Sequence, residues 1–168
     1  MENPQDNPDV AKIVRNLMVL NGAFIMSVLL LLAVVLVLRK QGAERPEVPV
    51  VSYLAASLGP VVLMISLILA PSLDSQARKA AATQDRDQID LHLARGLVSK
   101  NIMLVALLEG AAIANLIVFM LEDRLLCLAV GGAVLLAMAA HFPTMDHAAR
   151  WIERQKQLIQ DAFEQGVQ

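Results

Sequence analysis

The chain has 168 residues, of which 57% are hydrophobic and 18% charged, and its net charge is −2. This apolar composition excludes a disordered chain, and the crowding of charges into a few segments excludes an ordinary soluble domain. Acidic residues slightly outnumber basic ones, and the basic residues form no stripe along the sequence, so we expect no nucleic-acid partner.

Four apolar stretches hold half of the residues and contain one formal charge, Glu109. They are Leu17–Leu38, Val48–Ala70, Asn101–Leu121 and Leu125–Phe142. Each is long enough to cross a hydrocarbon core of about 30 Å as a helix. The sequence therefore predicts an all-α membrane protein with four transmembrane helices in two tandem helical hairpins. For the last and shortest stretch, a re-entrant segment is the alternative.

The N-terminal half begins with a predicted cytoplasmic tail at residues 1–16, in which Asp9 is expected to cap a helix starting near Val10. The first transmembrane hairpin follows at residues 17–70, with a turn over Arg39–Glu47. Residues 71–100 are polar with helical composition. We expect them to form one or two cytoplasmic helices that lie on the membrane surface or rise from it.

The second predicted transmembrane hairpin, residues 101–142, has only Glu122-Asp123-Arg124 between its spans, which forces an antiparallel arrangement. Residues 143–168 are predicted to form an amphipathic cytoplasmic tail helix. Trp151 near its start suits an interfacial anchor. The alternative is a helix that packs on its own protein.

Lys and Arg residues in the flanks predict the orientation. With four spans, the two tails and residues 71–100 share one side and carry ten of these residues, against four in the other two loops. We therefore expect both termini to be cytoplasmic, in a multi-pass protein of the bacterial inner membrane.

An octapeptide occurs twice, at Pro71–Arg78 and Pro143–Arg150, with the pattern P-[ST]-[LM]-D-x-x-A-R. The stretches Leu20–Ala23 and Leu108–Ala111 match more weakly. Together they predict a duplicated two-helix unit, a parallel internal repeat. In each octapeptide Pro is expected to end a membrane helix, Ser or Thr to cap the next helix, and Asp to pair with Arg four residues later.

Glu109 lies near the middle of the third stretch, where a charged carboxylate costs at least a few kcal/mol. We therefore predict a protonated carboxyl that is hydrogen-bonded to a polar side chain. Asn21, at the repeat-equivalent place, is the expected partner, and the further candidates are Asn115, Ser27, Ser52, Ser57 and Ser66. The pair either joins helices or forms a reversible proton or cation site.

Small residues recur at four-residue spacing in the third stretch (Ala106, Gly110, Ala114) and in the fourth (Ala129, Ala133, Ala137). Because the connection between these stretches is so short, we expect the two seams to face each other. Ala55 and Gly59 predict a further close contact in the second stretch.

The sequence offers no nucleophile elbow, phosphate loop or metal-ligand spacing, so we expect no enzyme, cofactor or metal. Ala106–Ala112 with Asn115, followed by Phe142–Thr144 and Trp151–Glu153, resembles a group of uncharacterised small multi-pass bacterial membrane proteins. This resemblance implies no activity. The plan of a duplicated hairpin with one carboxylate is loosely similar to the proteolipid subunits of rotary ATPases. Those subunits carry the carboxylate on the second helix of a hairpin, whereas Glu109 is on the first helix of the second predicted hairpin.

The leading functional prediction is a non-enzymatic membrane protein that assembles, with itself or with a membrane partner, through small-residue seams and the Glu109 hydrogen bond. The alternative is a component of proton- or cation-coupled transport that uses Glu109.

Overall fold

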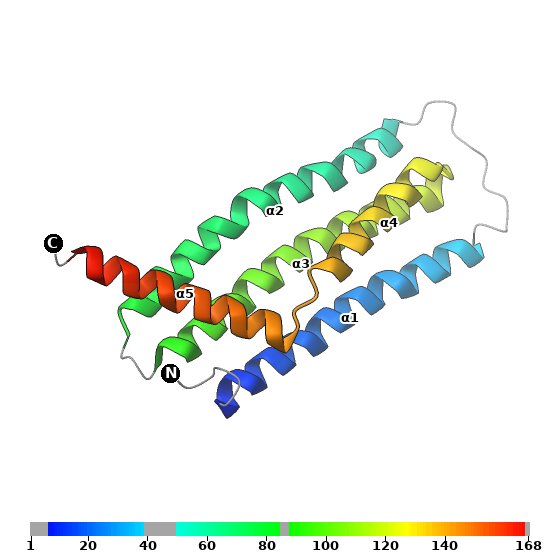
Figure 1. Ribbon diagram of the computed structural model, residues 1–168. Helices are drawn as coiled ribbons and strands as arrows, with labels where there is room; N and C mark the ends of the chain where they lie inside the picture. Colours follow the sequence, from blue (N-terminus) through cyan, green and yellow to red (C-terminus); the bar gives the residue numbers. More distant parts are fainter. Residues whose placement is uncertain (1–6, 39–49, 85–87, 167–168) are drawn as a thin grey trace. The chain divides into compact units, whose positions relative to one another are not determined.

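The computed structural model describes residues 7–38, 50–84 and 88–166. These residues form five helices and no strand: α1 (Pro8–Leu38), α2 (Val50–Ala82), α3 (Ile89–Glu122), α4 (Leu125–Ala140) and α5 (Met145–Gly166) (Figure 1). The all-α prediction is confirmed. The turn predicted over Arg39–Glu47 lies outside the described residues.

Three helices, α1, α2 and α3, are long and apolar enough to cross a membrane, and α4 with α5 passes the same test only as a broken pair. The described residues thus contain three candidate spans, or four. With 16 residues α4 is the shortest helix, about 24 Å long at the standard rise. It ends at Ala140, two residues before the predicted end of the fourth stretch.

The cap of α1 differs from the expectation. The helix begins at Pro8, and the side-chain oxygen of Asn7 accepts the backbone N–H of Asp9 at 3.0 Å. Asn7 is therefore the cap, and the prediction of Asp9 is wrong. Proline suits the first helical position because it has no N–H to leave unpaired there.

The two octapeptides adopt different conformations. At Pro143–Arg150 the chain breaks between α4 and α5, and Thr144 Oγ1 accepts the His147 N–H at 3.2 Å, so this predicted cap is confirmed. At Pro71–Arg78 helix α2 continues without a break to Ala82, so the predicted helix end at Pro71 is wrong. Residues 71–100 are thus mostly the end of α2 and the start of α3.

The connection between α3 and α4 is shorter than expected, since Glu122 ends α3 and only Asp123 and Arg124 remain. Asp123 has a φ of 48°, the left-handed conformation that ends helices, and aspartate tolerates it better than most residues. The two helices turn back on each other, which confirms the predicted antiparallel hairpin (Figure 1).

The structure divides into two compact units, each with its own apolar core. The first unit comprises the described residues of 1–20, 69–103 and 143–168, and the second comprises those of 21–68 and 104–142. The core of the first unit includes Leu17, Leu93 and Ile152, and the core of the second includes Leu116 and Phe119.

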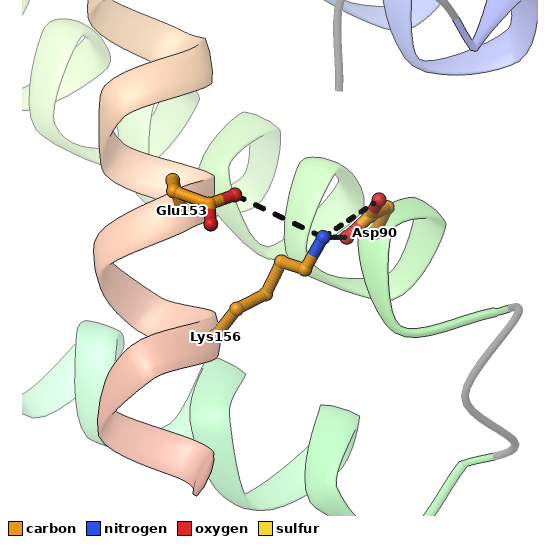
Figure 2. A network of polar contacts seen from close by, with 3 residues as sticks. All are labelled: Asp90, Glu153 and Lys156. Carbon is orange, nitrogen blue, oxygen red and sulfur yellow. Dashed lines mark hydrogen bonds and ion pairs between the residues drawn. The ribbon is translucent and has the colours of Figure 1, made fainter. Parts of the chain in front are cut away.

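Helix α5 packs on its own protein. Its apolar residues Ala148, Ile152 and Ile159 are buried in the core of the first unit, as the alternative for this segment predicted. Its Lys156 Nζ lies 3.0 Å from Asp90 Oδ1 at the start of α3 and 3.9 Å from Glu153 Oε2 (Figure 2).

A second lysine, Lys100 on α3, contacts both α2 and α5. Its Nζ lies 2.7 Å from Asp74 Oδ1 and 5.6 Å from the ring centroid of Trp151, which is half-buried. Asp74 therefore pairs with Lys100, and the expected Asp74–Arg78 pair is wrong. The Lys156–Asp90 pair joins α5 to α3, and the Lys100–Asp74 pair joins α3 to α2. Each of these partly exposed ion pairs contributes about 1 kcal/mol or less.

Candidate functional site

Glu109 and Ser27 form a hydrogen-bonded pair between α3 and α1 in the second unit. The Ser27 hydroxyl donates to Glu109 Oε1, and it also lies 2.8 Å from the backbone oxygen of Phe24. Ser27 is exposed and Glu109 is half-buried. The predicted hydrogen bond to a polar side chain is therefore present, and its partner is one of the further candidates of the sequence.

The other two predicted site residues are buried. Asn21, the expected partner, lies on α1 six residues before Ser27 and is 3% exposed. Asn115 lies on α3 six residues after Glu109, and its Nδ2 donates to the backbone oxygen of Ala111 at 2.9 Å. Among the described residues, no partner is found for the buried Asn115 Oδ1.

The surface beside Glu109 is formed by small residues. Ala106 and Gly110 are exposed, and a Cβ atom added to Gly110 would meet nothing within 4 Å. Positions three and four apart share one side of a helix. Ala106 lies three residues before Glu109 and four before Gly110, so it lies between the two around α3, and Gly110 is about 100° from Glu109. We call Ala106, Glu109, Gly110 and Ser27 the Glu109 face.

The predicted match between the α3 and α4 seams is wrong. Ala129 and Ala133 are exposed, like Ala106 and Gly110. The two helices instead meet at Gly131, where an added Cβ would lie 3.5 Å from Asn115 Cβ and 3.6 Å from the backbone oxygen of Ala112. Gly131 and Ala112 lie on nearly the opposite side of each helix from the seams. The four exposed seam residues therefore stay on the surface, and the other two, Ala114 and Ala137, are half-buried.

The close contact predicted at Ala55 and Gly59 is confirmed, and its partner is α4. Both residues are buried, and an added Cβ at Gly59 would lie 2.5 Å from Val130 Cγ1. Only a residue without a side chain allows α2 and α4 to approach so closely.

A second serine–glutamate pair was missed by the sequence reasoning, which placed Glu122 in a loop. Glu122 Oε2 accepts the Ser52 backbone N–H at 3.0 Å and also the Ser52 hydroxyl. The two residues are 7% and 1% exposed. The Cys127 thiol adds a 3.5 Å contact to the backbone oxygen of Ser52.

Glu122 thereby caps α2 from another helix. Ser52 is the third residue of α2, and the first four N–H groups of a helix have no partner within it. A carboxylate at this end also interacts favourably with the helix dipole. No local sequence pattern indicates this role, because the two residues are 70 positions apart.

The described part of the chain contains no group of three or more His, Cys, Asp or Glu residues that could hold a metal ion. Comparisons with protein-family models, curated proteins and solved structures found no match.

Proposed function

We propose that this chain is a non-enzymatic integral membrane protein that assembles laterally, with copies of itself or with a membrane partner, through the Glu109 face. The observation that supports this proposal is the position of the Ser27–Glu109 pair. It is a polar pair on the surface of the second unit, within two of the most apolar helices of the chain.

A single copy in a bilayer would leave this pair beside lipid. Lipid offers no hydrogen bond, so a carboxyl group there is unfavourable, and transmembrane helices shield such groups by packing together. Ala106 and Gly110 favour that packing, because small residues allow a second helix to approach the backbone closely.

The proposal includes four spans in two tandem hairpins, with α4 as the short fourth span and both termini in the cytoplasm. The repeated octapeptide and the excess of Lys and Arg in the two tails and residues 71–100 support it. A cysteine placed between Gly42 and Glu47 should react with membrane-impermeant maleimide only from outside the cytoplasm. Reaction only from the cytoplasmic side would contradict this topology.

Cysteine cross-linking in membranes tests the assembly. In a Cys127→Ala background, Ala106→Cys is expected to give cross-linked species, and Leu67→Cys, an exposed position of α2, serves as the control that does not. Adding Glu109→Leu should abolish the cross-link, whereas Glu109→Gln should retain it because an amide still hydrogen-bonds. Equal cross-linking at both positions, or its survival with Glu109→Leu, would contradict the proposal.

The ion-coupled alternative makes a different prediction for the same residue. It requires that Glu109→Gln folds and assembles normally but no longer supports proton- or cation-coupled transport. It also requires that a hydrophobic carbodiimide labels the wild-type Glu109 carboxyl in a pH-dependent manner. Assembly that depends on hydrogen bonding alone also allows Glu109→Gln to assemble, but it requires neither the loss of activity nor the pH-dependent labelling.

A further inference from the structure

A cleft in the first unit lies between the end of α2 and the second half of α5. It has a volume of about 370 Å³ and is lined by Arg78 and Lys79 on α2 and by Leu158, Ile159 and Phe163 on α5, among others. Leu158 and Phe163 are 38% and 59% exposed. The cleft thus combines two cations with apolar surface that the chain itself leaves uncovered.

The positive charge of this cleft is not neutralised by the described residues. No acidic side chain lines the described cleft. The described ion pairs of the first unit use Lys100 and Lys156, and none involves Arg78 or Lys79. The cleft therefore favours a ligand that carries a negative charge.

The two cations follow a candidate membrane span on the same helix. Arg78 lies eight residues after Ala70, the last residue of the apolar stretch, which is about 12 Å further along a helix. The headgroup layer adds about 5–8 Å on each side of the hydrocarbon core. Long cationic side chains can extend along apolar surface to place their charge at that level.

We propose that this cleft binds the headgroup region of an anionic phospholipid. Arg78 and Lys79 would hold the phosphate, because basic pockets near the cytoplasmic ends of membrane helices suit such headgroups. Leu158 and Phe163 would contact the glycerol and the upper acyl chain. A zwitterionic lipid would bind less tightly, because its own ammonium group offsets the phosphate charge.

Native mass spectrometry of the full chain in detergent, titrated with dioleoyl phosphatidylglycerol or dioleoyl phosphatidylcholine, tests this site. The wild type should bind the anionic lipid preferentially. Arg78→Gln and Lys79→Gln should each weaken that binding about five-fold. Phe163→Ser should weaken the binding of both lipids. Because Phe163 is exposed, this variant should fold like the wild type.

Arg154→Gln is the matched control, since it removes an exposed cation of α5 that does not line the cleft. It should leave the affinity for phosphatidylglycerol unchanged. An equal loss with Arg154→Gln would overturn the proposal, because the attraction would then be a property of the whole surface. Displacement of the lipid by millimolar inorganic phosphate would also overturn it, in favour of a site for free anions.

Discussion

The second unit contains two pairs of the same chemistry in opposite environments. Glu122 and Ser52 are both buried, and Glu122 binds two groups of Ser52 at the start of α2. Glu109 and Ser27 share one hydrogen bond, and Ser27 is exposed. The first pair satisfies buried polar groups inside the chain, whereas the second leaves a polar group on an apolar surface.

The contrast shows that a carboxyl group in an apolar helix has no single meaning. A buried carboxylate that accepts a helix N-terminal N–H stabilises the fold. A carboxyl on the surface of a membrane-spanning helix stabilises contact with another molecule, because lipid cannot satisfy it. Variants of the two pairs should therefore affect different measurements most strongly: the free energy of unfolding for the Glu122 pair, and association between chains for the Glu109 pair.

The largest effect is expected for Glu122→Ala. It leaves the buried N–H and hydroxyl of Ser52 without their acceptor, and each such group costs about 1–3 kcal/mol. We expect the free energy of unfolding to fall by about 3 kcal/mol, measured by reversible unfolding with sodium dodecyl sulfate in mixed micelles. Glu122→Gln, which keeps an acceptor oxygen, should lose clearly less. Equal losses for the two variants would show that hydrogen bonding is not the cause.

Gly59→Ala should give the next largest effect, again on folding. The added Cβ would lie 2.5 Å from Val130 Cγ1, so α2 and α4 would have to move apart. Overpacking of this kind costs about 1–3 kcal/mol. Gly132→Ala is the matched control on α4, since an added Cβ there meets nothing within 4 Å. If both variants unfold alike, the close α2–α4 contact is not a determinant of stability.

Gly110→Leu should affect assembly without affecting folding. The space around Gly110 is open within one chain, so the free energy of unfolding of the monomer should stay the same. A bulky side chain on the Glu109 face should keep a second helix away and weaken association by about 1 kcal/mol. Förster transfer between labelled chains in vesicles measures the association. Unchanged transfer would exclude this face as the contact surface.

The smallest effect is expected for Ser27→Ala, which removes the donor described for Glu109. Hydrogen bonds between membrane helices average about 0.6 kcal/mol, and we expect a loss of that size in monomer unfolding. Ser57→Ala is the matched control, because Ser57 donates only to Leu54 of its own helix, at 2.7 Å, in the described structure. The Ser27 variant should unfold more readily than the control. Identical unfolding curves for the two variants would argue against the Ser27–Glu109 hydrogen bond.

The sequence predicted the helical class, the candidate spans and the carboxyl of Glu109, because these depend on composition and on the length of apolar runs. It did not predict that the two octapeptides adopt different conformations, although both carry Pro, Asp, Ala and Arg at the same positions. The local sequence permits a helix to break at either proline. Contacts with other helices in the folded chain decide whether the helix breaks or continues. In the first copy α2 extends through Pro71, where Asp74 pairs with Lys100 of α3.

The role of Glu122 could not be predicted for a similar reason. Its partner, Ser52, is distant in sequence and lies on another helix. Periodicity identified the small-residue seams but not the direction they face. Gly131 and Ala112, each two residues away from the nearest seam residues, form the contact between α3 and α4 instead. Which side of a helix faces its neighbour depends on packing between helices, and spacing along one helix does not determine it.

The Glu109 face is proposed to contribute far more to assembly than to folding. The most direct test is the association constant of the chain in vesicles, compared with the free energy of unfolding of the monomer, for wild type, Glu109→Gln and Glu109→Leu. We expect Glu109→Leu to lose association and Glu109→Gln to retain it, and neither variant to lose more monomer stability than Ser27→Ala. Association of Glu109→Leu at the wild-type level would contradict an assembly role for the Glu109 face.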